Sequence, residues 1–410
     1  MAQSNLLPVA AALRIVLAET PRLAPVTVAL EEARGRVLAE DVTADTDLPP
    51  FDRALMDGYA VRATDTQAAP VRLRIVGEAA AGRGWRGTLK ADEAVRIMTG
   101  APIPAGADSV QQVELTRELE DGAWVELERT TQAGQFISRR ATEIKRGEVV
   151  LRAGMEINAA GLAALASFGR ARVLVGPRPR VAVLATGTEL VAVDAQPGPD
   201  QIRDSNTYSL VGYATAAGAD VERLPFAGDD PDLLKRLIAE AGGRADVLVL
   251  SGGVSMGVYD FTKAALRALG AEIFFERVSL RPGKPTVFAR LRGEGRALVF
   301  GLPGNPVSVS VTFNLFARTA LRAMQGARDA ALVEERAILG RAVKGAEERA
   351  SYLPAQLRTD DAGRLVAEPL RWGGSSDFVA FTKADALLIV DAGVRTVEAG
   401  AVVRVVRLPA

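Results

Sequence analysis

Between residues 180 and 325, short apolar runs alternate with helical patterns, and this alternation restricts the possible folds more than any other feature of the chain. The apolar runs predict strands at residues 181–185, 221–226, 246–250, 286–289 and 297–300. Helical spacing predicts helices at residues 206–217, 231–241, 261–269 and 306–323. Continuous apolar strands separated by helices are typical of a parallel sheet covered on both faces. We therefore expect a doubly wound α/β domain over residues 178–327.

The segments that flank this domain follow other patterns. Apolar side chains recur at helical spacing over residues 6–19 and again over residues 158–169. Between these helices, prolines, glycines and alternating runs such as 71–76 and 124–128 predict a β-rich insertion. Runs at 387–390 and 402–406 predict a small all-β domain. The expected domains are a helical linker domain (1–46 and 145–177), an inserted β-rich domain (47–144), the α/β domain, and a β domain (328–410).

The chain contains neither histidine nor cysteine, so disulfides, Cys/His zinc sites, thiolate nucleophiles and Ser-His-Asp triads are excluded. Its 50 basic and 50 acidic residues balance, which argues against a nucleic-acid partner. The apolar run near the N-terminus is interrupted by Arg14 and is too short to span a membrane. We expect a cytoplasmic protein whose chemistry uses carboxylates, Lys, Arg, hydroxyls, backbone amides and hard metals.

Three of the predicted strands are followed by loops rich in Gly, Ser and Thr, at residues 186–190, 251–260 and 301–308. In a parallel sheet, such loops meet beyond the carboxyl ends of the strands, where glycine amides and helix starts favour anions. The alternative for each loop alone is ordinary turn chemistry, with Asp204 or Ser205 capping a helix. Because three loops converge, we favour an oxyanion or phosphate site.

Charged residues in the same domain indicate two kinds of ligand. Arg281 and Lys284 place positive charge on a proline-rich turn before the fourth strand, although a solvated surface position is the alternative for Lys284. Acidic residues stand in loops of this domain, at Glu189, Asp229, Asp230 and Asp260. Carboxylates beside phosphate donors indicate a Mg²⁺ site, while helix capping or solvated surface is the alternative for each residue alone.

Six longer motifs stand out along the chain. They are Pro-Pro-Phe-Asp at 49–52, Met-Asp-Gly-Tyr-Ala-Val-Arg at 56–62, Thr-Gly-Ala-Pro-Ile-Pro at 99–104, Ser-Gly-Gly-Val-Ser at 251–255, Pro-Gly-Lys-Pro at 282–285 and Leu-Pro-Gly-Asn-Pro-Val-Ser at 302–308. Together they resemble the molybdopterin molybdenumtransferase family, which includes MoeA and the gephyrin E domain. The motifs occur in the order found in the family, and the resemblance covers nearly the whole chain.

The resemblance implies a multidomain α/β homodimer with a helical linker domain, an inserted β-rich domain, an adenylyltransferase-like α/β domain and a C-terminal β-barrel. It implies insertion of molybdenum from molybdate into adenylylated molybdopterin, with Mg²⁺-dependent release of AMP. The inserted domain is expected to face the partner's α/β domain. Molybdopterin adenylyltransferase and apo-molybdoenzymes are the expected transient partners, without nucleic acid or membrane.

The resemblance and the loop chemistry together assign roles to individual residues. The predicted catalytic residues are Asp57, Thr99, Glu189, Asp229 and Asp260, and the last three are also the predicted Mg²⁺ ligands. Molybdopterin and AMP are expected to contact Thr186, Gly187, Ser251, Gly252, Gly253, Pro303, Gly304 and Asn305. Molybdate is a tetrahedral dianion that needs hydrogen-bond donors, for which the candidates are Ser255, Arg281, Lys284 and Ser308.

The sequence departs from the family pattern at two acidic positions. Thr188 stands where the family has Asp in Thr-Gly-Asp-Glu, and Ala-Thr-Glu at residues 141–143 replaces Gly-Glu-Asp. These departures leave open a cofactor-binding or scaffold paralogue without full insertion activity. The Thr-Gly-x-Glu-Leu and Asp-Ser-Asn motifs also resemble CinA-type nucleotide hydrolases, and the α/β segment alone resembles molybdopterin adenylyltransferase.

Overall fold

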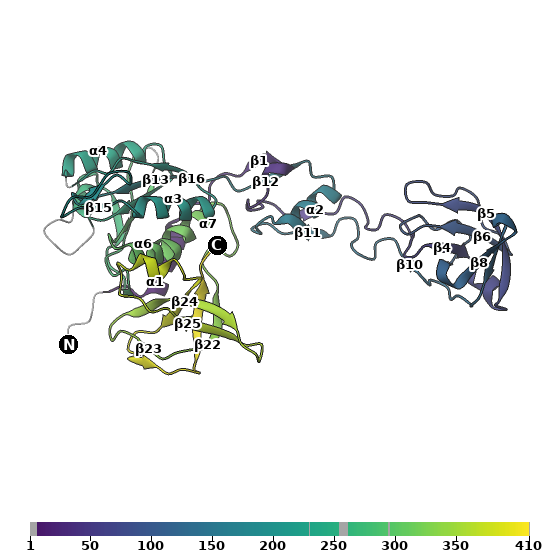
Figure 1. The fold of residues 1–410 in the computed structure, drawn as a ribbon. Helices are drawn as coiled ribbons and strands as arrows, with labels where there is room; N and C mark the ends of the chain where they lie inside the picture. Colours follow the sequence, from purple (N-terminus) through teal and green to yellow (C-terminus); the bar gives the residue numbers. More distant parts are fainter. Residues whose placement is uncertain (1–5, 229, 254–260, 294–295, 410) are drawn as a thin grey trace. The chain divides into compact units, whose positions relative to one another are not determined.

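The computed structural model describes residues 6–228, 230–253, 261–293 and 296–409 of the 410-residue chain. The chain forms two compact units (Figure 1). Unit 1 comprises Met1–Glu40, Ala153–Leu162 and Arg172–Ala410, and unit 2 comprises Asp41–Arg152 and Ala163–Ala171. None of the helices within the described ranges is long and apolar enough to cross a lipid bilayer.

A six-stranded sheet in unit 1 has the strand order β16-β13-β17-β21-β20-β18. Its strands are β13 (Arg180–Ala185), β16 (Asp220–Arg223), β17 (Val247–Ser251), β18 (Glu272–Phe275), β20 (Val287–Arg290) and β21 (Leu298–Leu302). The first four strands in this order are parallel, whereas β20 runs antiparallel to both neighbours. The prediction of a wholly parallel sheet is therefore wrong at β20. Residues 291–297 are too few for a parallel crossover, which needs about a dozen residues or more, so β20 and β21 form a hairpin.

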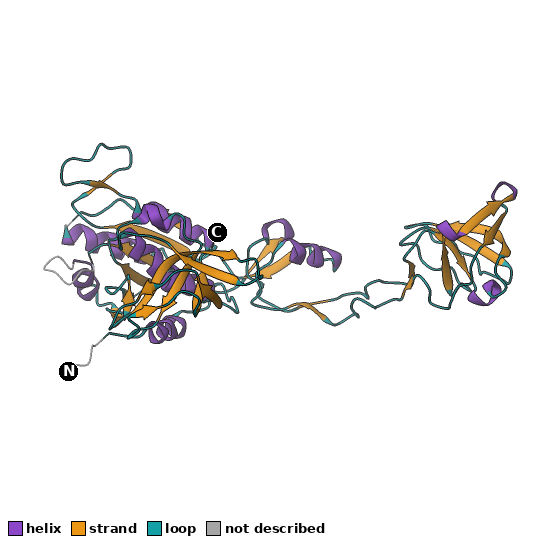
Figure 2. Cartoon of the chain, turned by 60° about the horizontal axis from the view of Figure 1, so that its bottom comes forward, coloured by secondary structure: helices purple, strands orange, loops and turns teal. Residues whose placement is uncertain are grey.

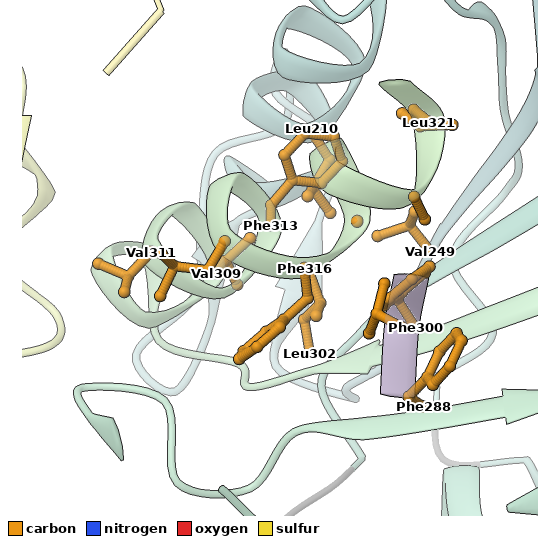
Figure 3. Close-up of a cluster of buried hydrophobic side chains, with 14 of the residues drawn as sticks. Leu210, Val249, Phe288, Phe300, Leu302, Val309, Val311, Phe313, Phe316 and Leu321 are labelled. Atoms are coloured by element: carbon orange, nitrogen blue, oxygen red, sulfur yellow. The ribbon is translucent and has the colours of Figure 1, made fainter. Parts of the chain in front are cut away.

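Helices cover both faces of this sheet, as expected for a doubly wound arrangement. One face packs on α1 (Val9–Glu19), α3 (Asn206–Ala216), α6 (Pro306–Thr312) and α7 (Arg318–Met324). The other face packs on α4 (Pro231–Gly242) and α5 (Phe261–Ala268). Alternate residues of β13 serve the two cores, with Val181 and Val183 on the first face and Ala182 and Leu184 on the second. Figure 3 shows part of the first core, where aromatic and aliphatic side chains lie between the strands and α3, α6 and α7.

Two predicted helices differ in detail from the observed ones. The first begins at Val9 rather than at residue 6, since Pro8 has an extended backbone and Leu7 instead forms a β-bridge with Val278. The helix predicted over 306–323 contains a π-helical segment, η5 (Phe313–Ala317), between α6 and α7. Around this segment, the side chains of Thr312, Asn314 and Thr319 hydrogen-bond to backbone carbonyls four residues earlier. Such bonds often bend a helix.

The C-terminal strands close into a barrel. Its strands are β22 (Glu334–Leu339), β24 (Ala350–Thr359), β25 (Leu365–Pro369), β26 (Ala386–Val390) and β28 (Val402–Arg407). The pairing order β24-β25-β22-β28-β26 returns to β24 through a β24–β26 ladder. The sequence did not predict that β19 (Leu280–Arg281) would pair in parallel with β24 or that α8 (Phe378–Phe381) would interrupt this all-β segment. The β19–β24 pair attaches the Arg281 turn to the barrel.

Unit 2 contains a second six-stranded sheet, in the order β7-β4-β6-β5-β9-β8. Its strands are drawn in orange in Figure 2. Its strands are β4 (Gly58–Val61), β5 (Val71–Ala79), β6 (Glu93–Ile97), β7 (Ser109–Gln112), β8 (Thr116–Leu119) and β9 (Trp124–Leu127), of which β5 and β9 confirm the predicted runs. Gly58 has a φ of +156°, and a Cβ there would lie 1.9 Å from the Gln111 carbonyl oxygen. The glycine is therefore required for β4 to approach β7 closely.

Shorter elements complete the two units. In unit 1, β1 (Val26–Ala29) pairs with β12 (Arg172–Val175), β14 (Leu190–Val191) with β15 (Ile202–Arg203), and β23 (Val343–Lys344) with β27 (Thr396–Val397). In unit 2, β2 (Val42–Thr43) pairs with β11 (Val149–Leu151), and β3 (Arg53–Ala54) with β10 (Ile137–Ser138). The helix predicted over 158–169 is α2 (Ala159–Ser167), which begins after Asn158 because that side chain accepts the Gly161 N–H.

Candidate functional site

The loops that follow β13, β17 and β21 meet at one edge of the unit 1 sheet, because these strands are parallel neighbours. A cavity of about 980 Å³, called the strand-end cavity below, lies among them. Its walls include all eight residues predicted to contact molybdopterin or AMP, namely Thr186, Gly187, Ser251, Gly252, Gly253, Pro303, Gly304 and Asn305. The prediction that these three loops converge is confirmed.

Two glycines of the middle loop have backbones that a larger residue would strain. Gly252 has a φ of +91°, and a Cβ there would lie 2.6 Å from the Thr186 carbonyl oxygen. Gly253 has a φ of +62°, and its Cβ would lie 2.7 Å from Thr262 Oγ1. The two loops therefore approach each other through their backbones, which leaves hydroxyl and amide groups at the cavity wall.

Asn206 connects these loops, a role that the sequence did not reveal. Its Nδ2 donates to Ser251 Oγ at 2.9 Å and to the Gly304 carbonyl oxygen at 2.7 Å. Its Oδ1 is buried and has no hydrogen-bond partner among the described residues. The only signal in the sequence is the position of this amide at the first turn of a helix, where polar residues are common.

The capping alternative holds for two of the acidic residues. Asp204 Oδ1 accepts the Thr207 N–H at 3.1 Å, so this buried carboxylate caps the start of α3. Asp230 Oδ1 accepts the N–H groups of Asp232 and Leu233, each at 3.0 Å, and caps α4. The two carboxylates are thereby committed to local structure.

A second cavity, of about 550 Å³, adjoins the strand-end cavity and shares Pro285, Pro303 and Asn305 with it. We call it the cationic cavity, since Arg281, Lys284 and Arg349 line it. Within the described ranges, none of these three side chains forms an ion pair with a carboxylate. Uncompensated positive charge in a concave site favours an anion.

The cationic cavity contains three of the four predicted molybdate ligands, Arg281, Lys284 and Ser308, while Ser255 lies outside the described residues. Gly283, between the two cations, has a φ of +117°, and a Cβ there would lie 2.5 Å from Thr312 Cγ2 of α6. The absence of a side chain at Gly283 therefore lets the cationic turn pack directly against the helix that carries Ser308.

The C-terminal segment supplies the other side of this cavity, through Arg349 and residues 372–375. Ser375 is tied to the loop after β21, because its Oγ accepts from Asn305 Nδ2 at 2.8 Å and its carbonyl oxygen accepts the Val307 N–H at 3.0 Å. Sequence reasoning missed Arg349 and Ser375, since they lie far along the chain from the anion loops and no local motif marks them.

In unit 2, the predicted residues Asp57 and Thr99 lie in contact. Asp57 Oδ1 accepts from both the backbone N–H and the hydroxyl of Thr99, each at 2.6 Å. The Thr99 hydroxyl, followed by its N–H group, lowers the pKa of Asp57, so the carboxylate is ionised at neutral pH. Both residues are exposed.

Comparison with known proteins gives matches along nearly the full length. Family models match as the MoeA N-terminal region (domain I and II) at residues 7–169, a probable molybdopterin binding domain at 182–323, and the MoeA C-terminal region (domain IV) at 336–408. The molybdopterin molybdenumtransferase of Bacillus subtilis is 36% identical over 384 residues, covering 92% of this chain and 88% of that protein. The chain belongs to the MoeA family of molybdopterin molybdenumtransferases.

Other MoeA relatives extend this match to both ends of the chain. The molybdopterin molybdenumtransferase of Staphylococcus aureus strain COL is 34% identical over 406 residues, covering 98% of this chain and 96% of that protein. A solved MoeA structure from Pyrococcus horikosii has a TM-score of 0.79 at 31% identity, covering 98% of this chain and 99% of that one. Another, from Pyrococcus horikoshii OT3, has a TM-score of 0.83 at 28% identity, covering 98% and 100%. Full-length similarity to MoeA proteins does not favour the hydrolase or scaffold alternatives.

The family's acidic loop is represented here by Glu189, which lies exposed at the strand-end cavity. Gly187 has a φ of +143°, and a Cβ there would lie 2.4 Å from Glu189 Oε2, so the carboxylate rests against the glycine backbone. The other predicted metal ligands, Asp229 and Asp260, lie outside the described residues. Within the described ranges, no group of three or more possible metal ligands occurs. The Mg²⁺ site therefore stays a prediction.

The second departure from the MoeA pattern lies in unit 2. Ala141, where the family has Gly, has a φ of +62°, which an L-residue adopts with strain. Glu143 forms an ion pair with Arg53 at 2.9 Å, and Asp52 accepts from Arg139 Nη1 at 2.6 Å and from the Arg140 N–H at 2.8 Å. The acidic and basic residues of segments 52–53 and 139–143 thus bind each other in the structure.

Proposed function

We propose that this chain inserts molybdenum from molybdate into adenylylated molybdopterin and releases AMP. The proposal is supported by relatives that match the chain over nearly its full length and bear the name molybdopterin molybdenumtransferase. It is also supported by the presence of two adjoining cavities with different chemistry. This adjacency is the observation on which the assignment of substrates depends.

Adenylylated molybdopterin is assigned to the strand-end cavity. The hydroxyls of Thr186 and Ser251 and the backbone at Gly252, Gly253 and Gly304 suit a phosphate-containing ligand. Because Asn206 binds both Ser251 and Gly304, it fixes the positions of two of these loops before a ligand arrives. Such preorganisation lowers the cost of ordering the site on binding.

Molybdate is assigned to the cationic cavity, with Arg281, Lys284 and Arg349 as charged donors and Ser308 and Ser375 as neutral ones. Ser255 is proposed as a further donor. Charge-assisted hydrogen bonds are the strongest contacts available to a small dianion. Since the two cavities share walls, molybdate bound in one lies next to the molybdopterin bound in the other, which favours transfer without release to solvent.

Mg²⁺ is proposed to bind at Glu189, with Asp229 and Asp260 as the other ligands. Glu189 fits this role, because its carboxylate lies at the strand-end cavity whereas Asp204 is occupied as a helix cap. When bound, Mg²⁺ would neutralise charge on the pyrophosphate of the substrate. The carboxylates would orient the water that releases AMP, and Asp57 and Thr99 are proposed as further catalytic residues.

The direct test is to mix purified protein with adenylylated molybdopterin, molybdate and Mg²⁺, and to measure AMP release and activation of an apo-molybdoenzyme. Molybdate-dependent AMP release above a protein-free control is expected. Binding of the substrates without AMP release would instead support a scaffold.

The substitution Thr188→Asp restores the carboxylate of the family pattern. It is expected to lower the Mg²⁺ concentration needed for AMP release. Loss of AMP release would mean instead that this loop is built around a hydroxyl.

A homodimer is also proposed, in which unit 2 of one chain completes the site of its partner. Mixing the variants Asp57→Ala and Lys284→Ala tests this arrangement. If sites are shared, mixed dimers regain part of the lost activity at a molybdate concentration that is limiting for Lys284→Ala. If each chain forms its own site, mixing restores nothing. Molybdopterin adenylyltransferase and apo-molybdoenzymes remain the proposed transient partners, the first as donor of the substrate and the second as acceptors of the finished cofactor.

A further inference from the structure

A third cavity, of about 240 Å³, opens beside the strand-end cavity, and none of the roles above uses it. We call it the aromatic cavity. It shares Ser205, Asn206, Pro306 and Phe378 with the strand-end cavity. Cavities that hold a whole drug-sized ligand measure about 300–1,000 Å³, so this one fits a single ring system. A ligand in it would continue into the strand-end cavity.

The walls of the aromatic cavity suit a flat, uncharged group. Among the described residues, three aromatic ones line it, namely Tyr213, Phe378 and Phe381. Phe378 of α8 is 48% exposed. Tyr213 stacks on Phe313 of the core with ring centroids 5.7 Å apart, which holds its ring in place. None of the described residues that line the cavity is charged. A phosphate or carboxylate would therefore lose solvation without a counter-charge, whereas a ring would gain contact.

The hydroxyl protons on one wall are already used. Tyr213 Oη donates to Ser310 Oγ at 3.1 Å, and Ser310 Oγ donates to the Pro306 carbonyl oxygen at 3.0 Å. A hydroxyl has one proton and two lone pairs. After these donations, Tyr213 offers the cavity only a lone pair, so this wall accepts hydrogen bonds rather than donating them.

The opposite side shows the same pattern. Ser209 Oγ donates to the Asn206 carbonyl oxygen at 2.9 Å, and Thr382 Oγ1 donates to the Val379 carbonyl oxygen at 2.7 Å. Asn206 likewise uses Nδ2 to bind Ser251 Oγ and the Gly304 carbonyl oxygen. A ligand that gains hydrogen bonds from these side chains has to bring its own N–H groups.

We propose that the aromatic cavity is the subsite for an amino-substituted heteroaromatic ring of the substrate. This inference rests on the proposed function, which supplies a substrate with two such rings, adenine at one end and pterin at the other. Adenine is flat throughout, and the pyrimidinone ring of the reduced pterin is flat as well. Both are uncharged and carry an exocyclic amino group, which is the chemistry that the walls select. The adjoining strand-end cavity then holds the phosphates.

The ligand test uses full-length protein and two matched pairs of probes in titration calorimetry. AMP is compared with IMP, and pterin (2-amino-4-oxopteridine) with lumazine, which has an oxygen in place of the amino group. At least one amino compound is expected to bind about tenfold more tightly than its partner, because the oxygen would face lone pairs. Equal affinities within both pairs would overturn the proposal.

Two variants locate the ring in this cavity. Ser209→Leu should fill it, since Ser209 lines the aromatic cavity but not the strand-end cavity. Phe378→Ala removes the exposed aromatic wall. Each is expected to weaken the preferred probe about tenfold, as for loss of one base–aromatic stack. The matched control is Val379→Ala, from the same turn of α8, since Val379 is 63% exposed and lines none of the three cavities.

The outcomes separate the rings and separate this proposal from the proposed function. Weaker binding of AMP assigns the adenine ring to the aromatic cavity, and weaker binding of pterin assigns the pterin ring to it. Thermal unfolding has to confirm that the variants are folded. Unchanged affinities in both variants would overturn the subsite, even if wild-type protein releases AMP. Conversely, variant-sensitive ring binding by protein that never releases AMP would leave the subsite standing and refute the proposed function.

Discussion

The strand-end cavity and the cationic cavity adjoin each other, yet their walls are built from different parts of the chain. Backbone loops with Gly252 and Gly253 form much of the first, while the long charged side chains of Arg281, Lys284 and Arg349 define the second. Backbone donors are fixed by the fold, whereas charged side chains concentrate a field on a small ion. In the proposed function, this difference lets a protein without net charge attract molybdate locally while it holds a larger substrate by shape.

The sharpest test of this difference is to remove one cation at a time. Lys284→Ala and Arg349→Ala are each expected to raise the molybdate concentration at half-maximal AMP release about 10- to 100-fold, as for one lost charge-assisted hydrogen bond. AMP affinity should change much less. The control is Lys383→Ala, since Lys383 lines none of the three cavities. Equal losses for molybdate and AMP would mean that the two cavities are one site.

The backbone character of the strand-end cavity is tested by two glycines that differ in their surroundings. Gly252→Ala should destabilise its loop by about 1–3 kcal/mol and weaken the binding of AMP, because the φ of Gly252 is +91° and the new Cβ would meet the Thr186 carbonyl oxygen. Gly304→Ala is the control, since its Cβ would lie 3.8 Å from Gly252 Cα, an ordinary contact. Thermal unfolding and AMP titration measure both. A similar response of the two variants would show that close backbone approach is unimportant.

Asp377 holds the loop that borders both cavities, and its titration gives a smaller effect. The backbone N–H groups of Gly373 and then Ala380 lower the pKa of Asp377. The folded pKa lies below the unfolded one, so the carboxylate stabilises the loop above about pH 4 and loses this effect as the pH falls further. Asp377→Asn should lower the melting temperature at pH 7, and the difference from wild type should shrink below pH 4. A difference independent of pH would contradict this.

The smallest expected effect is on the stability of unit 2, outside both cavities. It measures the free-energy cost of backbone strain at one residue. Ala141 has a φ of +62°, so Ala141→Gly should stabilise unit 2 by about 0.5 kcal/mol, the relieved strain being partly offset by greater freedom of the unfolded chain. Urea unfolding measures the change, and molybdate dependence should stay the same. Destabilisation would mean that neighbouring contacts, not φ, determine this position.

Secondary structure and loop placement followed from local patterns because they depend on residues close in sequence. The runs that became β13, β17 and β21 were visible as apolar segments, and their parallel pairing was enough to place Thr186, Ser251 and Gly304 at one edge. The reversal of β20 was missed because an apolar run has no direction. Only the length of its connection to β21 indicated a hairpin.

The sequence by itself thus determined the loops, the glycines and the family, because each is encoded in short ordered motifs. The tertiary structure decided which distant side chains join them. Arg349 and Ser375 reach the cationic cavity through the β19–β24 pair and the contacts of Ser375 with Asn305 and Val307. Asn206 becomes a connector only when three strands lie side by side. Such contacts depend on barrel and sheet closing against each other, and local propensity carries no information about that packing.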